Sequence, residues 1–307
     1  MLENKNFIDL HKVDKKTLRK IIELGKKLKS SRSEKDSNLL RNKTLAMIFE
    51  KPSTRTRVSF EVGMRQLGGD VVTLLNENIQ SGRGETYADT ARVLSRYVDA
   101  LMVRTDDSNK LDELVSYSTV PVINGLTNST HPCQIMADIM TFEEHKGNIQ
   151  GKKVVWVGDG NNVCTSYIHA AVKFGFNLII ASPEQFSPKK SLLIWAKNLG
   201  AQVKVSLDPS EAVKNADLVV TDTHLSMHNE IVEAKSRLQI LRNFQVNKEL
   251  MSKAKSDAIF LHCLPAHRNV EVTDDVIDGH QSVVLDAAAN RLHVQKALMK
   301  WCFHDVT

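Results

Sequence analysis

The residues best suited to chemistry in the first half of the chain are the hydroxyl and guanidinium side chains at positions 53–57, Ser-Thr-Arg-Thr-Arg. They follow a short apolar segment typical of a buried strand, and Phe60, Met64 and Leu67 continue after them at helical spacing. The first N–H groups of a helix have no partner inside it, and the helix dipole adds partial positive charge there. Hydroxyl and arginine donors at such a turn are suited to holding a phosphate. The alternative is a Ser/Thr helix cap followed by surface arginines.

Two further polar positions follow in the first half. Arg104 comes after an apolar segment, at the carboxyl end of an expected strand, where open α/β sheets place their ligands. His131 and Gln134 lie one turn apart at the start of a helix over 131–147, which Pro132 opens. A neutral imidazole and a carboxamide at this spacing suit the polarisation of a carbonyl. A solvent-facing arginine, and a capping histidine beside a solvated glutamine, are the alternatives.

Polar residues follow apolar segments in the second half as well. Asn161 and Asn162 stand at a helix start, where their amides suit a small zwitterion or serve as caps. Asp222 follows the apolar segment 217–221, and a bound amine would satisfy its carboxylate. Cys263 follows another apolar segment. A nucleophilic or acid/base role would require a special environment, and cysteine is more often a small buried hydrophobe.

A glycine-containing turn opens the second half and bears on cofactor use. Gly158 and Gly160 resemble the start of a dinucleotide-binding fingerprint, but Val163 stands where the third glycine is expected. The pattern therefore disfavours a nicotinamide cofactor.

A regular alternation of strands and helices is needed to bring these residues to the edges of sheets. The expected strands lie at 44–50, 70–75, 98–103 and around 120 in the first half, and around 154, 178, 203, 218 and 259 in the second. Helical patterns separate them, with a first helix from Asp14 and a last one over 287–301. This alternation predicts an α/β fold with doubly wound parallel sheets. We expect residues 76–85 to form a polar loop, because this segment is too long for a tight turn.

Length and composition limit the remaining possibilities. A chain of 307 residues with 42% hydrophobic content is closer to two domains than to one. The formal charge of +5 comes from scattered basic residues, which favours small anionic substrates and argues against nucleic acid. No apolar stretch is long enough for a membrane span, so we expect a cytoplasmic protein. The four cysteines are far apart and match neither a disulfide framework nor a metal pattern.

Four motifs in one order carry a resemblance to a known family. Ser-Thr-Arg-Thr-Arg at 53–57, His-Pro-Cys-Gln at 131–134, Asp-Thr-x-x-Ser-Met at 222–227 and His-Cys-Leu-Pro at 262–265 resemble the ornithine-specific members of the aspartate/ornithine carbamoyltransferase family. The resemblance covers nearly the whole chain. It implies two doubly wound parallel-sheet domains joined by long helices. Residues 1–147 would bind carbamoyl phosphate and 148–307 ornithine, and a terminal helix over about 290–307 would pack back on the first domain.

The resemblance also implies roles for individual residues. The phosphate would be held by Ser53, Thr54, Arg55 and Thr56, and the carbamoyl group by Arg104, His131 and Gln134, with Pro132 and Cys133 between the last two. The amino-acid end of ornithine would be held by Asn162, Asp222, Ser226 and Met227, and the reacting centre closed by Cys263, Leu264 and Arg291. Gln80 would reach the site of a neighbouring subunit. The expected catalytic residues are Arg104, His131, Gln134 and Cys263, while Arg57 would support the turn.

The activity implied by the resemblance is carbamoyl transfer from carbamoyl phosphate to the side-chain amine of L-ornithine, which gives L-citrulline and phosphate for arginine biosynthesis rather than breakdown. It needs neither a cofactor nor a metal. The expected assembly is a homotrimer, or a multiple of trimers, with shared active sites. The sequence departs from the family pattern at two positions in the loop that begins at Asp222. His224 replaces the usual tryptophan, and His228 replaces the usual glycine. Before Arg291, residues 286–290 keep only the first of the usual acidic residues.

Three rival functions remain at this stage. One is a carbamoyltransferase for another amine, such as putrescine or an acylated ornithine, against which the Asp-x-x-x-Ser-Met pattern argues. Another is a nicotinamide-dependent oxidoreductase, which Val163 disfavours. The third is a non-catalytic carbamoyl-phosphate-binding or interaction protein, against which the presence of Arg55, Arg104, His131 and Cys263 argues.

Overall fold

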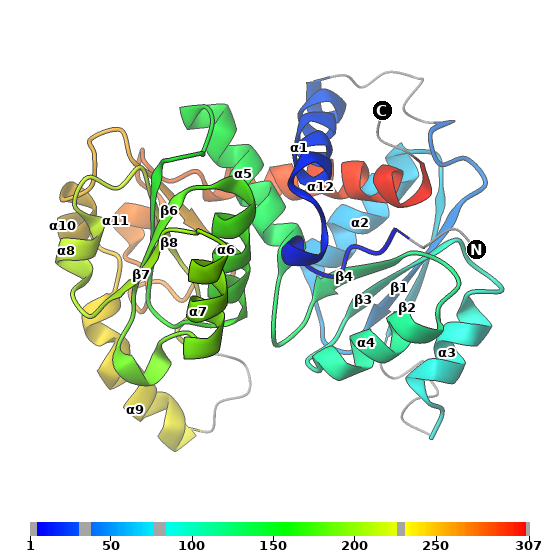
Figure 1. The fold of residues 1–307 in the computed structure, drawn as a ribbon, viewed down its shortest axis with the longest axis horizontal. Helices are drawn as coiled ribbons and strands as arrows, with labels where there is room; N and C mark the ends of the chain where they lie inside the picture. The colour runs from blue at the N-terminus through cyan, green and yellow to red at the C-terminus, as the bar shows by residue number, and fades with distance from the viewer. Residues whose placement is uncertain (1–4, 31–37, 76–83, 226–230, 305–307) are drawn as a thin grey trace. The chain divides into compact units, whose positions relative to one another are not determined.

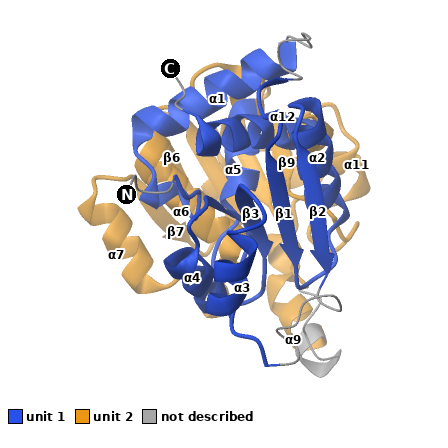
Figure 2. Cartoon of the chain, turned by 90° about the vertical axis from the view of Figure 1, so that its right-hand side faces the viewer, with its two compact units in different colours: residues 1–140, 289–307 blue, residues 141–288 orange. Residues whose placement is uncertain are grey.

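Apolar runs form the strands of two separate parallel sheets. The structure is a computed structural model that describes residues 5–30, 38–75, 84–225 and 231–304. The chain divides into unit 1, residues 1–140 and 289–307, and unit 2, residues 141–288 (Figure 2). Both divisions fall inside helices, α5 (Pro132–Lys146) and α12 (Val284–Phe303), so each of these helices contributes residues to both units.

Unit 1 is built on a four-stranded parallel sheet in the order β2-β1-β3-β4. Its strands are β1 (Thr44–Phe49), β2 (Asp70–Leu75), β3 (Ala100–Arg104) and β4 (Val122–Leu126). Its remaining helices are η1 (Leu10–Lys12), α1 (Lys15–Ser30), α2 (Thr54–Gln66), α3 (Tyr87–Leu94) and α4 (Ser108–Tyr117). Figure 1 shows α3 and α4 over one face of the sheet and α1, α2 and α12 over the other. The sheet is therefore covered on both faces, as its continuously apolar strands require.

The side chains of unit 1 alternate between its two cores. Ala46 and Ile48 of β1 pack with Leu101 and Val103 of β3 in a buried cluster that includes residues of α3 and α4. The intervening strand residues point to the opposite face, because successive side chains of a strand alternate. The register of β1 against β2 and β3 places the carboxyl ends of these three strands side by side.

Unit 2 repeats the same plan with five parallel strands in the order β7-β6-β5-β8-β9. The strands are β5 (Lys153–Val157), β6 (Asn177–Ala181), β7 (Val203–Ser206), β8 (Leu218–Thr221) and β9 (Ile259–His262). The helices are α6 (Asn162–Phe174), η5 (Glu184–Phe186), α7 (Lys190–Asn198), α8 (Pro209–Val213), α9 (Ile231–Leu241), η6 (Arg242–Phe244), α10 (Lys248–Ser252) and α11 (Asp274–Ile277). In Figure 1, α6 and α7 cover one face and α8, α10 and α11 the other.

Helix α12 returns to unit 1 and packs closely on α2. A Cβ atom added at Gly63 of α2 would lie 3.1 Å from Cε of Met299, which is closer than ordinary contact, so glycine allows the two helices to approach. Nζ of Lys296 also donates to Oε1 of Gln66 at 3.2 Å. The ring of Trp301 meets that of Phe7 edge-on, with centroids 6.3 Å apart. The C-terminal part of α12 thus packs into unit 1.

The structure confirms the expected fold class, including the return of the last helix to the first domain. The strands agree with the apolar segments to within two residues, and Arg104 is the last residue of β3 rather than the residue after it. The last helix begins at Val284, three residues earlier than its apolar pattern indicates. In the portion of the chain described here, no helix combines the length and apolar character that crossing a bilayer requires.

The core of unit 2 gives a stability prediction. Phe260 of β9 is fully buried in a cluster that contains Phe244 and Met251. Replacing it with alanine removes a large apolar side chain and leaves a cavity, so Phe260→Ala should lower the free energy of unfolding by about 3–5 kcal/mol. Urea unfolding followed by circular dichroism would measure this loss. Ile194→Ala, at a position 59% exposed, is the control, and equal losses in both variants would contradict the assigned core.

Candidate active site

The phosphate-type motif lies at the start of α2, next to the point where the strand order of unit 1 reverses. The chain leaves β1, passes through Ser53 in an extended conformation and enters α2 at Thr54. Ser53 occupies the N-cap position, but its side chain makes no capping hydrogen bond. Thr54 and Arg55 are exposed, whereas Thr56 is fully buried. The first turn of α2 therefore presents N–H groups that the Ser53 side chain does not cap, beside hydroxyl and guanidinium side chains, an arrangement suited to an anion.

The hydroxyl of Thr56 brings together two arginines from distant parts of the chain. Nη1 of Arg104, at the end of β3, lies 3.2 Å from Oγ1 of Thr56. Nη2 of Arg291, on α12, donates to the same oxygen at 2.8 Å. Arg291 is 3% exposed. Because β1 and β3 are adjacent, the structure assembles Thr56, Arg104 and Arg291 at the carboxyl edge of one sheet.

His131 belongs to the same cluster and is neutral. It is 4% exposed, directly before α5. Burial, followed by the positive charges of Arg291, Arg104 and Arg55, holds the pKa of His131 well below its ordinary value. A neutral imidazole carries one N–H, so His131 can donate a hydrogen bond without introducing a further charge.

The next turn of α5 orients Gln134. Its amide Nε2 donates to Oδ1 of Asp138 at 2.9 Å, and both residues are buried. Within the described residues, Oε1 of Gln134 has no hydrogen-bond partner. A buried carbonyl oxygen without a partner is unfavourable, so a ligand N–H would be a suitable partner for it.

Pro132 and Cys133 lie between these two residues and are both buried. The thiol of Cys133 donates to the carbonyl oxygen of Asn124 at 3.3 Å. Burial raises the pKa of the Cys133 thiol to about 12. The side chain is therefore protonated and packed in the core, and it does not carry out chemistry.

In unit 2 the predicted residues again follow neighbouring strands. Asn162 is the first residue of α6, after β5, and Asp222 follows β8, which pairs with β5. Oδ2 of Asp222 accepts from Nδ2 of Asn161 at 2.7 Å. Oδ1 of Asp222 accepts from Sγ of Cys263, after β9, at 2.8 Å. The carboxylate of Asp222 is thus held between the two turns that flank its own strand.

Leu264 lies in the same turn as Cys263. Its backbone has a positive φ of 55°, and its peptide bond to Pro265 is cis. The backbone N–H of Leu264 donates to Nδ1 of His262 at 2.9 Å, and Nε2 of His262 lies 3.3 Å from Oε1 of the buried Glu271. Because Nδ1 accepts a hydrogen bond, Nε2 carries the proton.

Three potential metal ligands lie close together in unit 2, although their spacing in the sequence does not match a metal-binding motif. Ligand atoms of Asp222, His262 and Cys263 lie within 4.8 Å of one another. Both ring nitrogens of His262 are already engaged, by Leu264 and by Glu271, and the thiol of Cys263 donates to Asp222. These hydrogen bonds account for the cluster, and we assign it no metal.

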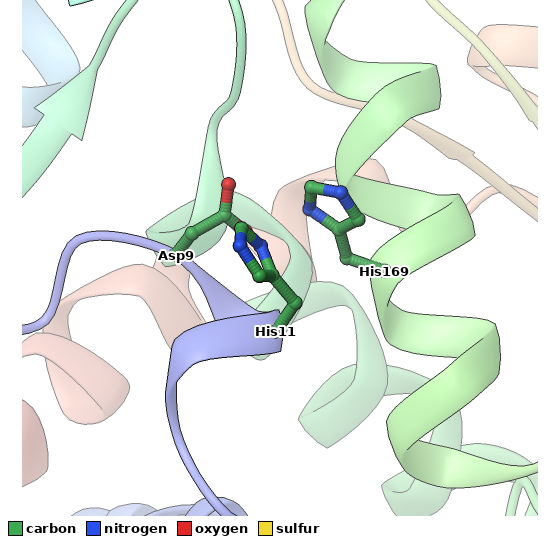
Figure 3. Close-up of side chains that lie close together, drawn as sticks. All are labelled: Asp9, His11 and His169. Carbon is green, nitrogen blue, oxygen red and sulfur yellow. The ribbon is translucent and has the colours of Figure 1, made fainter. Parts of the chain in front are cut away.

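A smaller polar cluster lies in η1 of unit 1. Oδ1 of Asp9 accepts from the backbone N–H of Leu10 at 2.6 Å, and Nδ1 of His11 lies 3.5 Å from the same oxygen (Figure 3). His169, also labelled in Figure 3, belongs to α6 of unit 2, where its ring meets that of Trp195 edge-on with centroids 5.2 Å apart. Asp9 caps η1 and His169 packs on α7, so neither receives a role in the site.

Some of the predicted residues lie outside the described part of the chain, and some residues of the site were not predicted. Gln80, Ser226 and Met227 fall in the first group, as does most of the expected loop over 76–85. Asn161, which accepts from two N–H groups of α6 and also donates to Asp222, was recognised only as one of a pair of asparagines. Asp138, four residues after Gln134, was not identified. Its i,i+4 spacing on a helix was the available signal.

Fold and site together define the class of the protein. It is a two-unit α/β protein in which hydroxyl, arginine and histidine side chains gather at the strand-order reversal of one sheet, and an asparagine, an aspartate and a cysteine gather at that of the other.

Comparison with known proteins identifies the family. Residues 5–144 match the family model "Aspartate/ornithine carbamoyltransferase, carbamoyl-P binding domain", and residues 150–302 match its "Asp/Orn binding domain". A protein of Rhodopseudomonas palustris (strain BisA53) named ornithine carbamoyltransferase is 55% identical over 305 residues, or 97% of each chain. The chain therefore belongs to the aspartate/ornithine carbamoyltransferase family.

Solved structures agree with this assignment. An ornithine carbamoyltransferase from Pyrococcus furiosus has a TM-score of 0.91 and 49% identity, covering 97% of this chain and 96% of that one. An anabolic ornithine carbamoyltransferase from Campylobacter jejuni has a TM-score of 0.91 and 37% identity, covering 97% and 99%.

The ring of His224 accounts for the glycine at position 158, and the low pKa of this histidine leads to a prediction about stability at low pH. The φ of Gly158 is +119°, and a Cβ atom added there would lie 2.6 Å from Nε2 of His224. The glycine therefore makes room for the histidine ring. Burial is the main cause that lowers the pKa of His224 to about 4.

Because the folded-state pKa of His224 is below the ordinary value, the unfolded chain binds the proton more readily. The corresponding stability is present above about pH 6.5 and is lost as the pH falls towards 4, by an amount on the order of 3 kcal/mol. Urea unfolding at pH 7.5 and 4.5 should show that His224→Gln removes most of this pH dependence. His280→Gln, which removes an exposed imidazole, is the matched control. An unchanged pH dependence in His224→Gln would contradict the prediction.

Proposed function

We propose that the protein transfers the carbamoyl group of carbamoyl phosphate to the side-chain amine of L-ornithine, giving L-citrulline and phosphate. The observation that carries the proposal is the convergence of Arg104 and Arg291 on Thr56 beside the neutral His131. Carbamoyl transfer needs donors for a phosphate dianion and for an oxyanion that develops on a carbonyl, and this edge of the sheet supplies both. The names of the relatives, and the match to both family models, support ornithine as the acceptor.

In unit 1, we assign the phosphate to the first turn of α2. Ser53, Thr54, Arg55 and Thr56 would donate to its oxygens. Arg104 and His131 would donate to the carbamoyl oxygen, where negative charge develops as the amine attacks. Oε1 of Gln134, oriented by Asp138, would accept from the carbamoyl NH₂. Pro132 and Cys133 would contribute through their backbone, and Arg291 through its guanidinium.

In unit 2, we assign ornithine to the edge formed by the ends of β5, β8 and β9. Asp222 would accept from its α-amino group, and Asn162, Ser226 and Met227 would hold the rest of its amino-acid end. Cys263 and Leu264 would lie next to the reacting side-chain amine. The neutral amine attacks the carbonyl carbon, the carbon–oxygen bond to phosphate breaks, and the proton lost by the amine leaves with the phosphate.

The proposal also covers the domain organisation, the oligomeric state, the cellular location and the pathway of the protein. We propose a domain that binds carbamoyl phosphate over residues 1–147 and one that binds ornithine over 148–307. We also propose a cytoplasmic homotrimer, or a multiple of trimers, in which Gln80 reaches a neighbouring site. The anabolic Campylobacter jejuni protein supports arginine biosynthesis over breakdown. No cofactor or metal enters the proposed reaction.

Product formation by the purified protein tests the reaction and the acceptor. We expect citrulline from carbamoyl phosphate and ornithine, and much slower product formation with putrescine, acetylornithine or aspartate. Preference for another amine would keep the chemistry but overturn the acceptor, and would locate the error near Asp222 and His224. Absence of any carbamoyl transfer by folded protein would favour a binding protein.

Removal of the carbonyl donors tests the assignment in unit 1. His131→Ala and Arg104→Ala should each lower kcat by roughly 10²–10³, because a preorganised oxyanion donor is lost. Circular dichroism should show both variants folded. Arg57→Ala is the matched control, since Arg57 is an exposed arginine of the same motif whose Nε lies 3.9 Å from Glu61. Wild-type turnover in His131→Ala would exclude the role assigned to that residue.

A further inference from the structure

An acidic residue stands beside the turn proposed to hold the phosphate. Glu50 directly follows β1 and precedes Ser53 by three residues. Its backbone N–H donates to the carbonyl oxygen of Arg104 at 3.0 Å, so Glu50 lies where the ends of β1 and β3 meet. Its side chain is only 6% exposed. A buried carboxylate next to an anion site is electrostatically unfavourable unless other groups neutralise it, so its contacts require an explanation.

The carboxylate of Glu50 connects three further elements of unit 1. Oε2 accepts from Oγ1 of Thr105, the residue after Arg104, at 2.5 Å. Oε1 accepts from Nζ of Lys110 on α4 at 2.9 Å and from the hydroxyl of Tyr87, the first residue of α3. Both oxygens are therefore used, and all their partners are donors.

The charge of Glu50 is balanced within this cluster. Burial acts to raise its pKa, but hydrogen bonds from Thr105, Tyr87 and Lys110 together hold that pKa below its ordinary value. Nζ of Lys110 also lies 5.4 Å from the centroid of the Tyr87 ring, within the range of a cation–π contact. The ionised carboxylate is thus occupied by its neighbours and is not itself a ligand for a phosphate.

We propose that Glu50 is a positioning residue for carbamoyl phosphate, because its carboxylate holds the turn after β1 in register with the Arg104 segment and with the start of α3. The proposal rests on the proposed function, since it concerns the same phosphate site. Through Thr105 it fixes the end of β3, and through its own backbone it fixes the entrance to Ser53. Tyr87 follows Gln80 by seven residues in the sequence, so the same carboxylate anchors the chain shortly after that residue.

A second carboxylate provides a matched control. Asp99 lies at the opposite ends of the same two strands, directly before β3, where Oδ1 accepts from Nζ of Lys43 at 2.8 Å and Oδ2 from the backbone N–H of Thr44 at 2.9 Å. Like Glu50, it links the β1 segment to the β3 segment and accepts from a lysine, although the lysine partner of Glu50, Lys110, lies on α4. It differs in lying at the amino ends of the strands, away from the phosphate turn. Its side chain is also more exposed, at 32% against 6% for Glu50. The comparison tests whether a carboxylate that links these strands affects phosphate binding when it lies away from the phosphate turn.

Calorimetric titration with inorganic phosphate, together with steady-state kinetics, tests the proposal on the full chain. Glu50→Gln should raise the Kd for phosphate and the KM for carbamoyl phosphate by roughly tenfold, as expected when a charge-assisted hydrogen bond is lost. The KM for ornithine should change by less than about threefold in the same variant, because its proposed ligands belong to unit 2. Asp99→Asn should leave all three constants near their wild-type values. Thr105→Val removes the donor to Glu50 beside Arg104, together with the acceptor for the backbone N–H of Asp107. It should shift Kd in the same direction by a smaller factor, which keeps the test valid if Glu50→Gln does not fold.

An unchanged Kd for phosphate in both Glu50→Gln and Thr105→Val would overturn the proposal, as would an equal rise in Asp99→Asn. If the wild-type protein forms no citrulline, the proposed function fails, but the phosphate titrations still decide the role of Glu50.

Discussion

The constraint on which the site depends is the reversal of strand order in each parallel sheet. In unit 1 the chain moves from β1 to β2 on one side and then returns to place β3 on the other, so the strand order reverses between β1 and β3, where open α/β sheets bind their ligands. Unit 2 repeats this arrangement at β5 and β8. Polar residues that follow these strands come together because the carboxyl ends of neighbouring parallel strands lie at the same edge of the sheet.

Electrostatics determines how the cluster of unit 1 can exist before a ligand binds. Arg104 and Arg291 repel each other, the Thr56 hydroxyl accepts from both, and His131, which feels the charge of both, stays neutral. A charged imidazole would add a third cation to a buried site. Burial is the main cause of the low pKa of His131, and the positive field of the arginines lowers that pKa further. The same field favours an incoming anion, so one arrangement serves both the binding of an anion and the protonation state of the histidine.

Much of the fold could be predicted from the sequence, because apolar segments of strand length alternate with helical patterns in both halves. The position of Arg104 followed from the same pattern, with an error of one residue. The contact of Arg291 with Thr56 could not be derived from periodicity, since it joins residues 235 positions apart and depends on the return of α12. The resemblance to a family implied that return, whereas local pattern did not.

The roles of three polar residues could not be predicted from the sequence for a different reason. The roles of Asp138, Asn161 and Glu50 depend on which donor each carboxylate or amide meets, and that is settled by side-chain packing across elements. Val163 stands where a dinucleotide fingerprint would have its third glycine. The structure supplies a separate reason for Gly158, which is the space required by the ring of His224. A glycine in a motif-like turn can thus serve the packing of its own chain.

The place of α12 in unit 1 has a consequence for protein synthesis. A nascent chain that ends before residue 284 already contains all four strands of unit 1 and the whole Ser-Thr-Arg-Thr-Arg turn, yet it lacks Arg291 and the helix that covers α2. One face of that sheet therefore stays incompletely covered during translation until all of unit 2 and then α12 have been synthesised. Unit 2 is continuous in sequence and can complete its core first. The first domain to be translated is therefore the last to be finished.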